Sequence, residues 1–202
     1  MRQIRASNCW LLVVLALLLL AGCQPPPFLS SSSTRDMPTC EELAQNETTK
    51  DSLLWTSLDR ENVSGFAYER AKPGVVVVGD SDEIAQISLY LREGAIETLR
   101  KINFDRYIVM IAFSGTESSG SLTFCLSVVD LQNQVLTLHS NLIRSAVESA
   151  DQNSYYHMIE LPRDELPKGE ITIRLMKTIY HYYGPVLKQE QGVVATTSAV
   201  LP

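Results

Sequence analysis

The sequence predicts an α+β fold, predominantly an antiparallel β-sheet with one main helix, preceded by a flexible tether. Three observations support this prediction. Runs of β-branched or alternating apolar residues recur across residues 75–183, which is typical of strands. One clear segment, 80–91, carries apolar side chains at helical spacing. A proline- and serine-rich stretch, 24–39, has too little apolar surface to pack into a core.

The N-terminus has the layout of a secretory signal peptide. Arg2 and Arg5 precede an unbroken apolar run, 10–20, which ends in small residues just before Cys23. From Cys9 to Ala21 the apolar stretch is about 13 residues, shorter than the roughly 20 that a helix needs to cross a bilayer, so a permanent span is disfavoured. Residues 1–22 are therefore expected to be the signal of an exported protein.

The end of this signal, Leu-Ala-Gly-Cys at 20–23, resembles the bacterial lipobox. The resemblance implies cleavage before Cys23 and a diacylglyceryl group on its sulfur. Each buried acyl methylene contributes about 0.8 kcal/mol, so two or three chains hold a protein on a membrane. We expect a lipid anchor on the outer surface of the bacterial cell membrane, with residues 23–39 as lipidated cysteine and tether. The leaflet or membrane stays open, and an ordinary cleaved signal and an uncleaved anchor are the alternatives.

Loss of the signal makes the chain more acidic. The full sequence has 17 Lys and Arg against 23 Asp and Glu, a formal charge of -6. Without Arg2 and Arg5, 15 basic residues face 23 acidic ones, a charge of -8. A nucleic-acid partner is therefore not expected. Residues 40–185 suffice for one β-rich globular domain, and 186–202, which show little packing pattern, predict a loosely packed C-terminal tail.

The first half of the domain predicts two buried strands on either side of the helix. Residues 41–58 are polar and ambiguous, and 66–70 suit a short strand before a Lys-Pro-Gly turn. The β-branched run 75–78 predicts a buried strand. Residues 106–113 are apolar on both alternating faces, as in a strand covered on both sides in the middle of a sheet.

The helix between these strands has its own start and stop signals. Asp80 is a cap residue, and Glu83 three positions later completes a box-like pattern. Gly94 is expected to end the helix. The second half of the domain alternates strands and turns. Strands are predicted at 122–128, 135–140, 155–161 and 170–183, a hairpin turn at 131–134, a polar loop at 145–154 and a proline-rich connection at 162–169.

Two cysteines are left to form a disulfide. Of the four cysteines, Cys9 leaves with the signal and Cys23 is consumed by the lipid, so Cys40 and Cys125 remain. In an exported protein such a pair permits one disulfide. One buried and one surface cysteine is the alternative, and the sequence does not decide between the two.

No pattern in the sequence indicates a catalytic or metal site. His139, His157 and His181 are widely spaced in predicted strands and accompany no Cys-x-x-Cys pair, so no zinc site is expected. A Gly-x-Ser-x-Gly nucleophile motif is absent. Gly115 and Gly120 have the spacing of a phosphate-binding loop, but the lysine that must follow is missing. We expect a protein without enzyme activity, cofactor or metal.

Two segments are candidates for contact with a partner protein. One is a small, polar loop between two core strands, where binding residues are often found. The other is a tyrosine cluster on the last predicted strand, since tyrosine is enriched at interfaces. A purely structural loop and an amphipathic strand are the alternatives. The candidates are Gly115, Thr116, Glu117, Ser118, Ser119 and Gly120 in the loop and Tyr180, Tyr182 and Tyr183 in the strand.

Residues 75–176 resemble the C-terminal domain of PrcB-type protease-complex lipoproteins. The similarity lies in the β-branched strand, the Ser-Asp-Glu helix start, Ile-Asn-Phe-Asp at 102–105, and Ile-Glu-Leu-Pro at 159–162 before Leu166-Pro167. The family usually has Asp-Phe where this chain has Asn103-Phe104. The resemblance implies a non-catalytic subunit that accompanies or stabilises a cell-surface protease.

These observations together favour a membrane-anchored accessory or binding subunit. Its expected partners are membrane lipid, through Cys23, and an exported protease or other envelope protein. One alternative is a lipoprotein that binds a small molecule or an envelope polymer in a sheet pocket lined by Tyr180 and Tyr182. The other is an exported hydrolase whose scattered catalytic residues include histidines.

Overall fold

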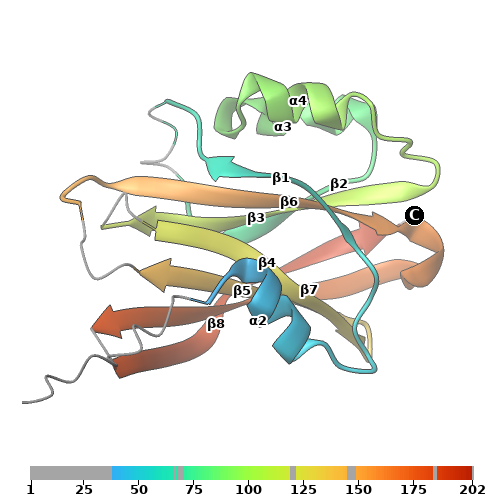
Figure 1. Cartoon of the computed structure of the whole chain (residues 1–202). Coiled ribbons are helices and arrows are strands. Elements are labelled where there is room, and N and C mark those ends of the chain that lie inside the picture. Colours follow the sequence, from blue (N-terminus) through green and yellow to red (C-terminus); the bar gives the residue numbers. More distant parts are fainter. Residues whose placement is uncertain are drawn as a thin grey trace, which may run out of the picture. The chain divides into compact units, whose positions relative to one another are not determined.

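Two four-stranded β-sheets pack face to face in the computed structural model (Figure 1). The strand order is β1-β6-β3-β2 in the first sheet and β4-β5-β7-β8 in the second. The structure describes residues 38–65, 67, 71–118, 122–144, 149–183 and 186–201, without the side chains of Glu47, Tyr182, Tyr183 and 186–188. The predicted signal and Cys23 lie outside the described residues. The expected α+β fold with mainly antiparallel strands is confirmed.

The first sheet is antiparallel throughout, with β3 and β6 in its middle. The segment 106–113 was predicted to be covered on both faces, and it forms most of β3. Met110 and Ile111, which point to opposite faces, are both fully buried. The strands are β1 (Thr56–Asn62), β2 (Gly74–Val78), β3 (Tyr107–Glu117) and β6 (Asn153–Pro162).

The second sheet begins with a tight hairpin and contains one parallel pair among its described strands. Asn133 and Gln134 connect β4 to β5 with φ values of 49° and 60°, the positive values that a two-residue hairpin turn requires. The predicted hairpin is therefore confirmed. β5 pairs in parallel with β7, because β6 joins the first sheet in between. The strands are β4 (Leu122–Gln132), β5 (Val135–Arg144), β7 (Gly169–Tyr183) and β8 (Val186–Leu201).

The main core lies between the two sheets. It consists of large apolar side chains from the inner faces of β3 to β8, and their burial is the main favourable term in folding. Fully buried members are Met110, Phe124, Leu136, Leu138, Leu142, Ile159, Leu161 and Leu175.

Short helices cover the outer face of the first sheet, and one helix, α2 (Cys40–Glu47), covers the outer face of the second (Figure 1). Thr39 caps α2: its Oγ1 accepts from the N–H of Glu42, whose carboxylate accepts from the N–H of Thr39. This reciprocal pair fixes where the helix begins. The helices on the first sheet are η2 (Ser81–Glu83), α3 (Ile84–Ile87), η3 (Ser88–Tyr90) and α4 (Glu93–Leu99).

The single helix expected at 80–91 is broken into three short pieces. Its start is as predicted, because Asp80 accepts from the N–H groups of Asp82 and Glu83. Ser88 then donates its hydroxyl to the carbonyl of Ala85, a bond that competes with the helical pattern. The prediction that Gly94 ends the helix is wrong, since Gly94 lies inside α4. The chain turns at Leu91 so that both helical segments reach the same sheet.

The prediction of a loosely packed tail at 186–202 is also wrong, because Val186–Leu201 forms β8. It pairs with β7 along the whole strand, from Tyr183↔Val186 to Gly169↔Leu201. The sequence carries little packing pattern here because β8 is an edge strand that contributes mainly small side chains to the core. Those side chains are Ala195, Ala199 and Leu201.

Candidate functional site

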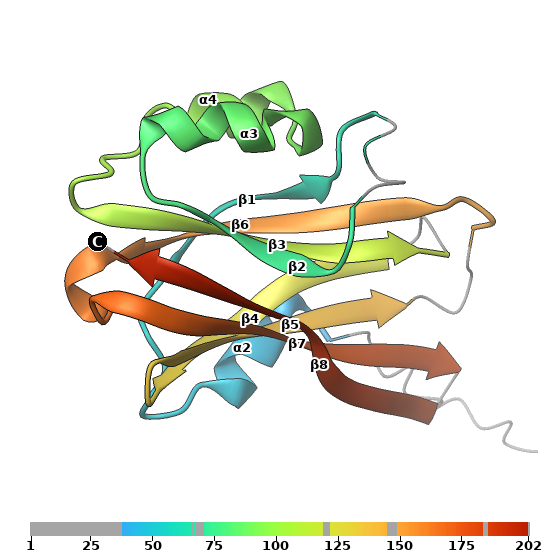
Figure 2. The ribbon, with the colours of Figure 1, turned by 180° about the vertical axis from the view of Figure 1, so that it is seen from behind.

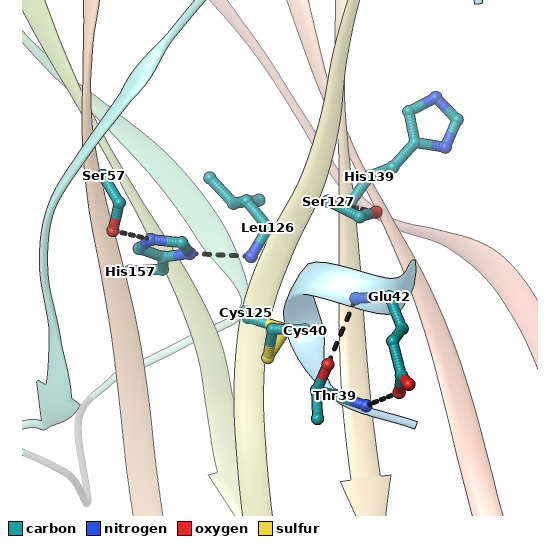
Figure 3. The surroundings of a disulfide bond; sticks show 9 residues. All are labelled: Thr39, Cys40, Glu42, Ser57, Cys125, Leu126, Ser127, His139 and His157. Atoms are coloured by element: carbon teal, nitrogen blue, oxygen red, sulfur yellow. Dashed lines mark hydrogen bonds between the residues drawn. A yellow bond between two sulfur atoms is a disulfide. The ribbon is translucent and has the colours of Figure 1, made fainter. Parts of the chain in front are cut away.

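A disulfide joins α2 to β4 (Figure 3). Cys40 is the first residue of α2, and its sulfur is bonded to that of Cys125, with the two Cα atoms 6.2 Å apart. Both cysteines are buried. Of the two arrangements that the sequence allowed, the structure contains the bonded pair.

Tyr180, predicted as an interface residue, is buried beneath α2 instead. It is 5% exposed and packs with Cys40, Leu43, Cys125 and Ile143. A side chain covered in this way does not reach a partner, so the prediction is wrong for Tyr180. The side chains of the other two candidate tyrosines, 182 and 183, lie outside those described. The small-molecule alternative placed Tyr180 and Tyr182 in the lining of a pocket. The burial of Tyr180 removes one of these two residues from that lining.

The candidate loop at 115–120 is only partly a loop. Gly115, Thr116 and Glu117 belong to β3, Ser118 follows it, and 119–120 lie outside the described residues. Gly115 has a φ of 81° at a register shift, and a Cβ there would lie 2.6 Å from Cδ of Pro73. The absence of a side chain at Gly115 therefore lets the backbone of β3 pass close to Pro73. The prediction of a loop is wrong for its first three residues, because β3 continues through the bulge to Glu117.

Glu117 holds two cations at the end of β3. Lys177 of β7 places Nζ 2.8 Å from Glu117 Oε1, and Arg144 of β5 places Nη2 3.3 Å from Oε2. All three side chains are largely buried, with 7%, 11% and 18% exposed for Glu117, Lys177 and Arg144. Lys177 also donates to the carbonyl of Ser114 at 3.1 Å. Because β3 lies in one sheet and β5 and β7 in the other, this cluster links the two sheets.

His157 of β6 is a second polar link between the sheets (Figure 3). Its Nδ1 accepts from the backbone N–H of Leu126 at 2.7 Å, and its Nε2 lies 2.8 Å from Oγ of Ser57. Since Nδ1 is an acceptor, the proton of the neutral ring is on Nε2 and is donated to Ser57. The ring in this state does not accept the serine proton, so the pair does not have the arrangement of a catalytic base and nucleophile.

Burial makes His157 a source of acid sensitivity. Desolvation, with a smaller contribution from the charge of Arg60, lowers its pKa from 6.5 to about 3. The unfolded chain therefore binds a proton before the folded chain does. This group leaves stability unaffected above about pH 6.5 and lowers it progressively as the pH falls from there toward 3, by about 2 kcal/mol at pH 5.

We expect this contribution to disappear in His157→Asn, which has no titrating ring. Urea unfolding at pH 7 and at pH 5 gives the loss of unfolding free energy between the two pH values for each protein, and the two losses are then compared. The wild type should lose about 2 kcal/mol more than the variant between the two pH values. The carboxylates titrate in both proteins, so their contribution to the pH dependence of stability cancels when the two losses are compared. Equal losses in the two proteins contradict the assignment.

His139 is paired with a carboxylate rather than with a serine side chain. Its Nε2 lies 3.2 Å from Oδ2 of Asp130, whose other oxygen accepts from Ser52 at 2.8 Å and from Thr49 at 3.2 Å. Asp130 therefore stands between the histidine and the two hydroxyls. A nucleophilic triad needs the histidine in the middle, so this arrangement does not match one.

A cleft of about 730 Å³ opens where the ends of β2 and β8 approach each other. Arg163 lies in its wall, but its guanidinium is occupied by backbone carbonyls of Phe104 at 2.6 Å, of Tyr107 at 3.3 Å and of Gly79. The remaining charged groups of the lining are the carboxylates of Asp80, Glu83 and Asp105. The cleft is therefore acidic and disfavours an anionic ligand.

A smaller groove of about 310 Å³, the β2 groove, lies between the start of β2 and η3. The rings of Tyr90 and Phe113 meet edge to face at 5.8 Å in its wall. Val76, which is 37% exposed, lines the same groove. Apolar concave surfaces of this size are typical of sites that accept a few apolar groups of a partner. The complete lining is Ala71, Lys72, Pro73, Gly74, Val75, Val76, Ile87, Tyr90 and Phe113.

The four edge strands are protected unequally. Residues 51–53 cover the edge of β4, where Leu53 donates to the carbonyl of Val129 at 2.7 Å. β1 carries the charged run Asp-Arg-Glu at 59–61. β2 has no charged residue, and β8 has none from 191 to 201. Figure 2 shows these last two edges on one side of the sandwich. Because charges and cover normally guard free edges, this side is the candidate binding side.

The predicted site residues and the site of the structure overlap little. Sequence reasoning missed Lys177 and Arg144, because the strand patterns do not distinguish these buried cations from exposed charges such as Arg174 in β7. It also missed the β2 groove, whose walls come from three segments far apart in the chain. Among the described residues, no three His, Cys, Asp or Glu side chains are placed to hold a metal ion.

Within the described part of the chain, no helix is both long and apolar enough to cross a membrane. No protein family, curated protein or solved structure matches this chain. The resemblance to PrcB-type subunits therefore depends on the sequence motifs alone, and the proposals that follow depend on those motifs and on the geometry of the described residues.

Proposed function

We propose that the chain is an exported lipoprotein that acts as a non-enzymatic accessory subunit and binds another protein of the cell envelope. The observation that carries the proposal is the signal that ends in Leu-Ala-Gly-Cys, which gives Cys23 as the lipid anchor. The disulfide between Cys40 and Cys125 supports export, because such bonds persist in oxidising compartments. The hydrogen bonds of His157 and the contact of His139 with Asp130 favour structural roles over catalysis.

The β2 groove is the proposed contact for the partner protein. It is concave, mainly apolar and lies beside an uncharged strand edge, which suits an extended apolar segment of a polypeptide. The sequence motifs shared with PrcB-type subunits make an exported protease the proposed partner. The lining of the acidic cleft, in contrast, contains one aromatic side chain, Phe104, together with three carboxylates.

Replacing Cys23 by alanine tests the anchor. Cys23→Ala is expected to remain unlipidated and to move from the detergent phase to the aqueous phase in a phase-partition experiment, because the acyl chains are absent. Cys9→Ala, a cysteine inside the predicted signal, is the control and should partition like the wild type. A Cys23→Ala protein that still partitions with membranes after signal cleavage contradicts the anchor.

Crosslinking from intact membranes tests the accessory function. Val76→Lys places a charge in the groove and should abolish crosslinking to an exported protease, whereas Leu54→Lys, at a site 76% exposed outside the groove, should not. Deletion of the gene should also change cell-surface proteolysis. If no protease is crosslinked to the wild type and deletion leaves proteolysis unchanged, the proposed partner is wrong.

A further inference from the structure

The outer edge of β8 pairs with no further strand in the part of the chain that the structure describes, and its last residues, 199–201, line the cleft shared with the end of β2. β8 is the last strand of the second sheet, so its pairing partner there is β7 alone. Val193 is 54% exposed and Val200 is 78% exposed. A register shift next to Val193 leaves Val194 as an extra residue, so regular pairing runs from Ala195 to Leu201. An uncharged, regular edge of this kind is a template for another strand.

The residues along this edge read almost the same in both directions from Thr197. In an antiparallel pair of identical strands, residues at equal distances from the centre lie opposite each other. Pairing centred on Thr197 would therefore bring like side chains together. Within the regularly paired segment the matched residues are Thr196 with Ser198 and Ala195 with Ala199.

We propose that β8 pairs antiparallel with β8 of a second copy of this chain, about a two-fold axis at Thr197. The pairing makes the second sheets of the two copies continuous and uses the free N–H and C=O groups of both edges. Thr196 of each copy lies opposite Ser198 of the other, a cross-strand hydroxyl pair that stabilises sheets. Ala195 lies opposite Ala199, a pair of small side chains that crowd neither face of the joined sheet.

Charge favours this edge over β1 for contact between two copies. The full chain has a formal charge of -6, so two copies repel each other on average. The segment 191–201 contains no charge and brings no like charges opposite each other. The edge of β1, in contrast, carries two carboxylates, Asp59 and Glu61. This inference goes beyond the proposed function, because the pairing needs neither the lipid nor a partner protein.

Single cysteines test the register of the pair in the full chain, expressed with its own signal. Thr197→Cys should form a disulfide-linked dimer on a non-reducing gel, because opposite Cα atoms are about 4.5 to 5.5 Å apart. Thr196→Cys and Ser198→Cys should each stay monomeric, because their own copies are diagonal at about 7 to 8 Å. Co-expression of these two variants should link one to the other.

Two outcomes of the crosslinking overturn the proposal. The first is that Thr197→Cys gives no dimer, or gives no more than Thr196→Cys alone. The second is that Thr197→Cys links to a different protein, which would assign this edge to another partner. If Thr197→Cys forms the dimer but no exported protease is crosslinked, the pairing of β8 stands and the proposed function fails, so the two failures are distinguishable.

Light scattering of the detergent-solubilised full chain gives a second test. Thr196 is exposed, so Thr196→Lys is tolerated by the single copy but places a charge inside the pair, and the dimer should be lost. Gln191→Lys, on the same strand outside the matched segment, should keep it. The Cys40–Cys125 bond reports correct folding of both variants. Equal dimer fractions for the two variants contradict the pairing.

Discussion

Replacing Cys40 and Cys125 together by serine should lower the free energy of unfolding by about 4.5 kcal/mol. The bond closes a sequence separation of 85 residues, and a crosslink of this span removes much of the conformational entropy of the unfolded chain. α2 has eight residues, too few for a stable isolated helix in water. Its position over Ile143 and Tyr180 therefore depends strongly on the bond.

Urea unfolding of the wild type and of the double variant, each with and without a reducing agent, measures this effect. Reduction should shift the midpoint of the wild type toward that of the variant and should leave the variant unchanged. A Cys40→Ala, Cys125→Ala pair separates the loss of the bond from the burial of serine hydroxyls. Identical midpoints for the oxidised wild type and both variants would show that the bond does not stabilise the fold.

Removing the carboxylate of Glu117 should cost about 3 to 5 kcal/mol of stability. Its two partners, Lys177 and Arg144, are largely buried, and without Glu117 both cations lose this carboxylate while they stay in the interior. Glu117→Ala removes both the charge and the hydrogen-bond acceptors. Glu117→Gln keeps an acceptor and should cost less, which separates the loss of charge from the loss of shape.

The chain offers a matched surface control for this prediction. Glu93 and Arg100 lie 3.4 Å apart in α4, with 72% and 62% of their side chains exposed. Glu93→Ala should cost less than about 1 kcal/mol, because solvent screens an exposed pair. The measurement is the urea midpoint at neutral pH. A cost for Glu117→Ala no larger than that for Glu93→Ala would show that the cluster does not hold the sheets together.

The sequence predicted strands best where apolar residues are large and periodic. The run at 106–113 and the hairpin at 131–134 were correctly interpreted, because both depend on neighbours in the chain. β8 was missed because most of its inward residues are small while valines such as Val193 and Val200 are exposed, so the strand shows no alternation between an apolar and a polar face. The parallel pairing of β5 with β7 was also not predicted from the sequence, because it depends on β6 joining the other sheet.

The candidate site was predicted less well than the fold, for a related reason. Tyr180 looks like an interface tyrosine in the sequence, and only the position of α2 shows that it is covered. Glu117 looks like a loop residue until Gly115 is seen to carry β3 through a bulge. In both cases the deciding contact comes from a distant segment, because α2 covers Tyr180 and Asn153 of β6 pairs with Glu117, and local patterns carry no information about such contacts.

The position of Cys40 also decides where mechanical load enters the fold. In the proposed lipoprotein, any pull between the membrane and the domain travels along the tether and reaches the domain at Thr39 and Cys40. The bond from Cys40 to Cys125 passes that force directly into β4, a strand hydrogen-bonded to β5 along its length. α2 is therefore not peeled from the sheet under tension, and a covalent bond rather than a short helix carries the load.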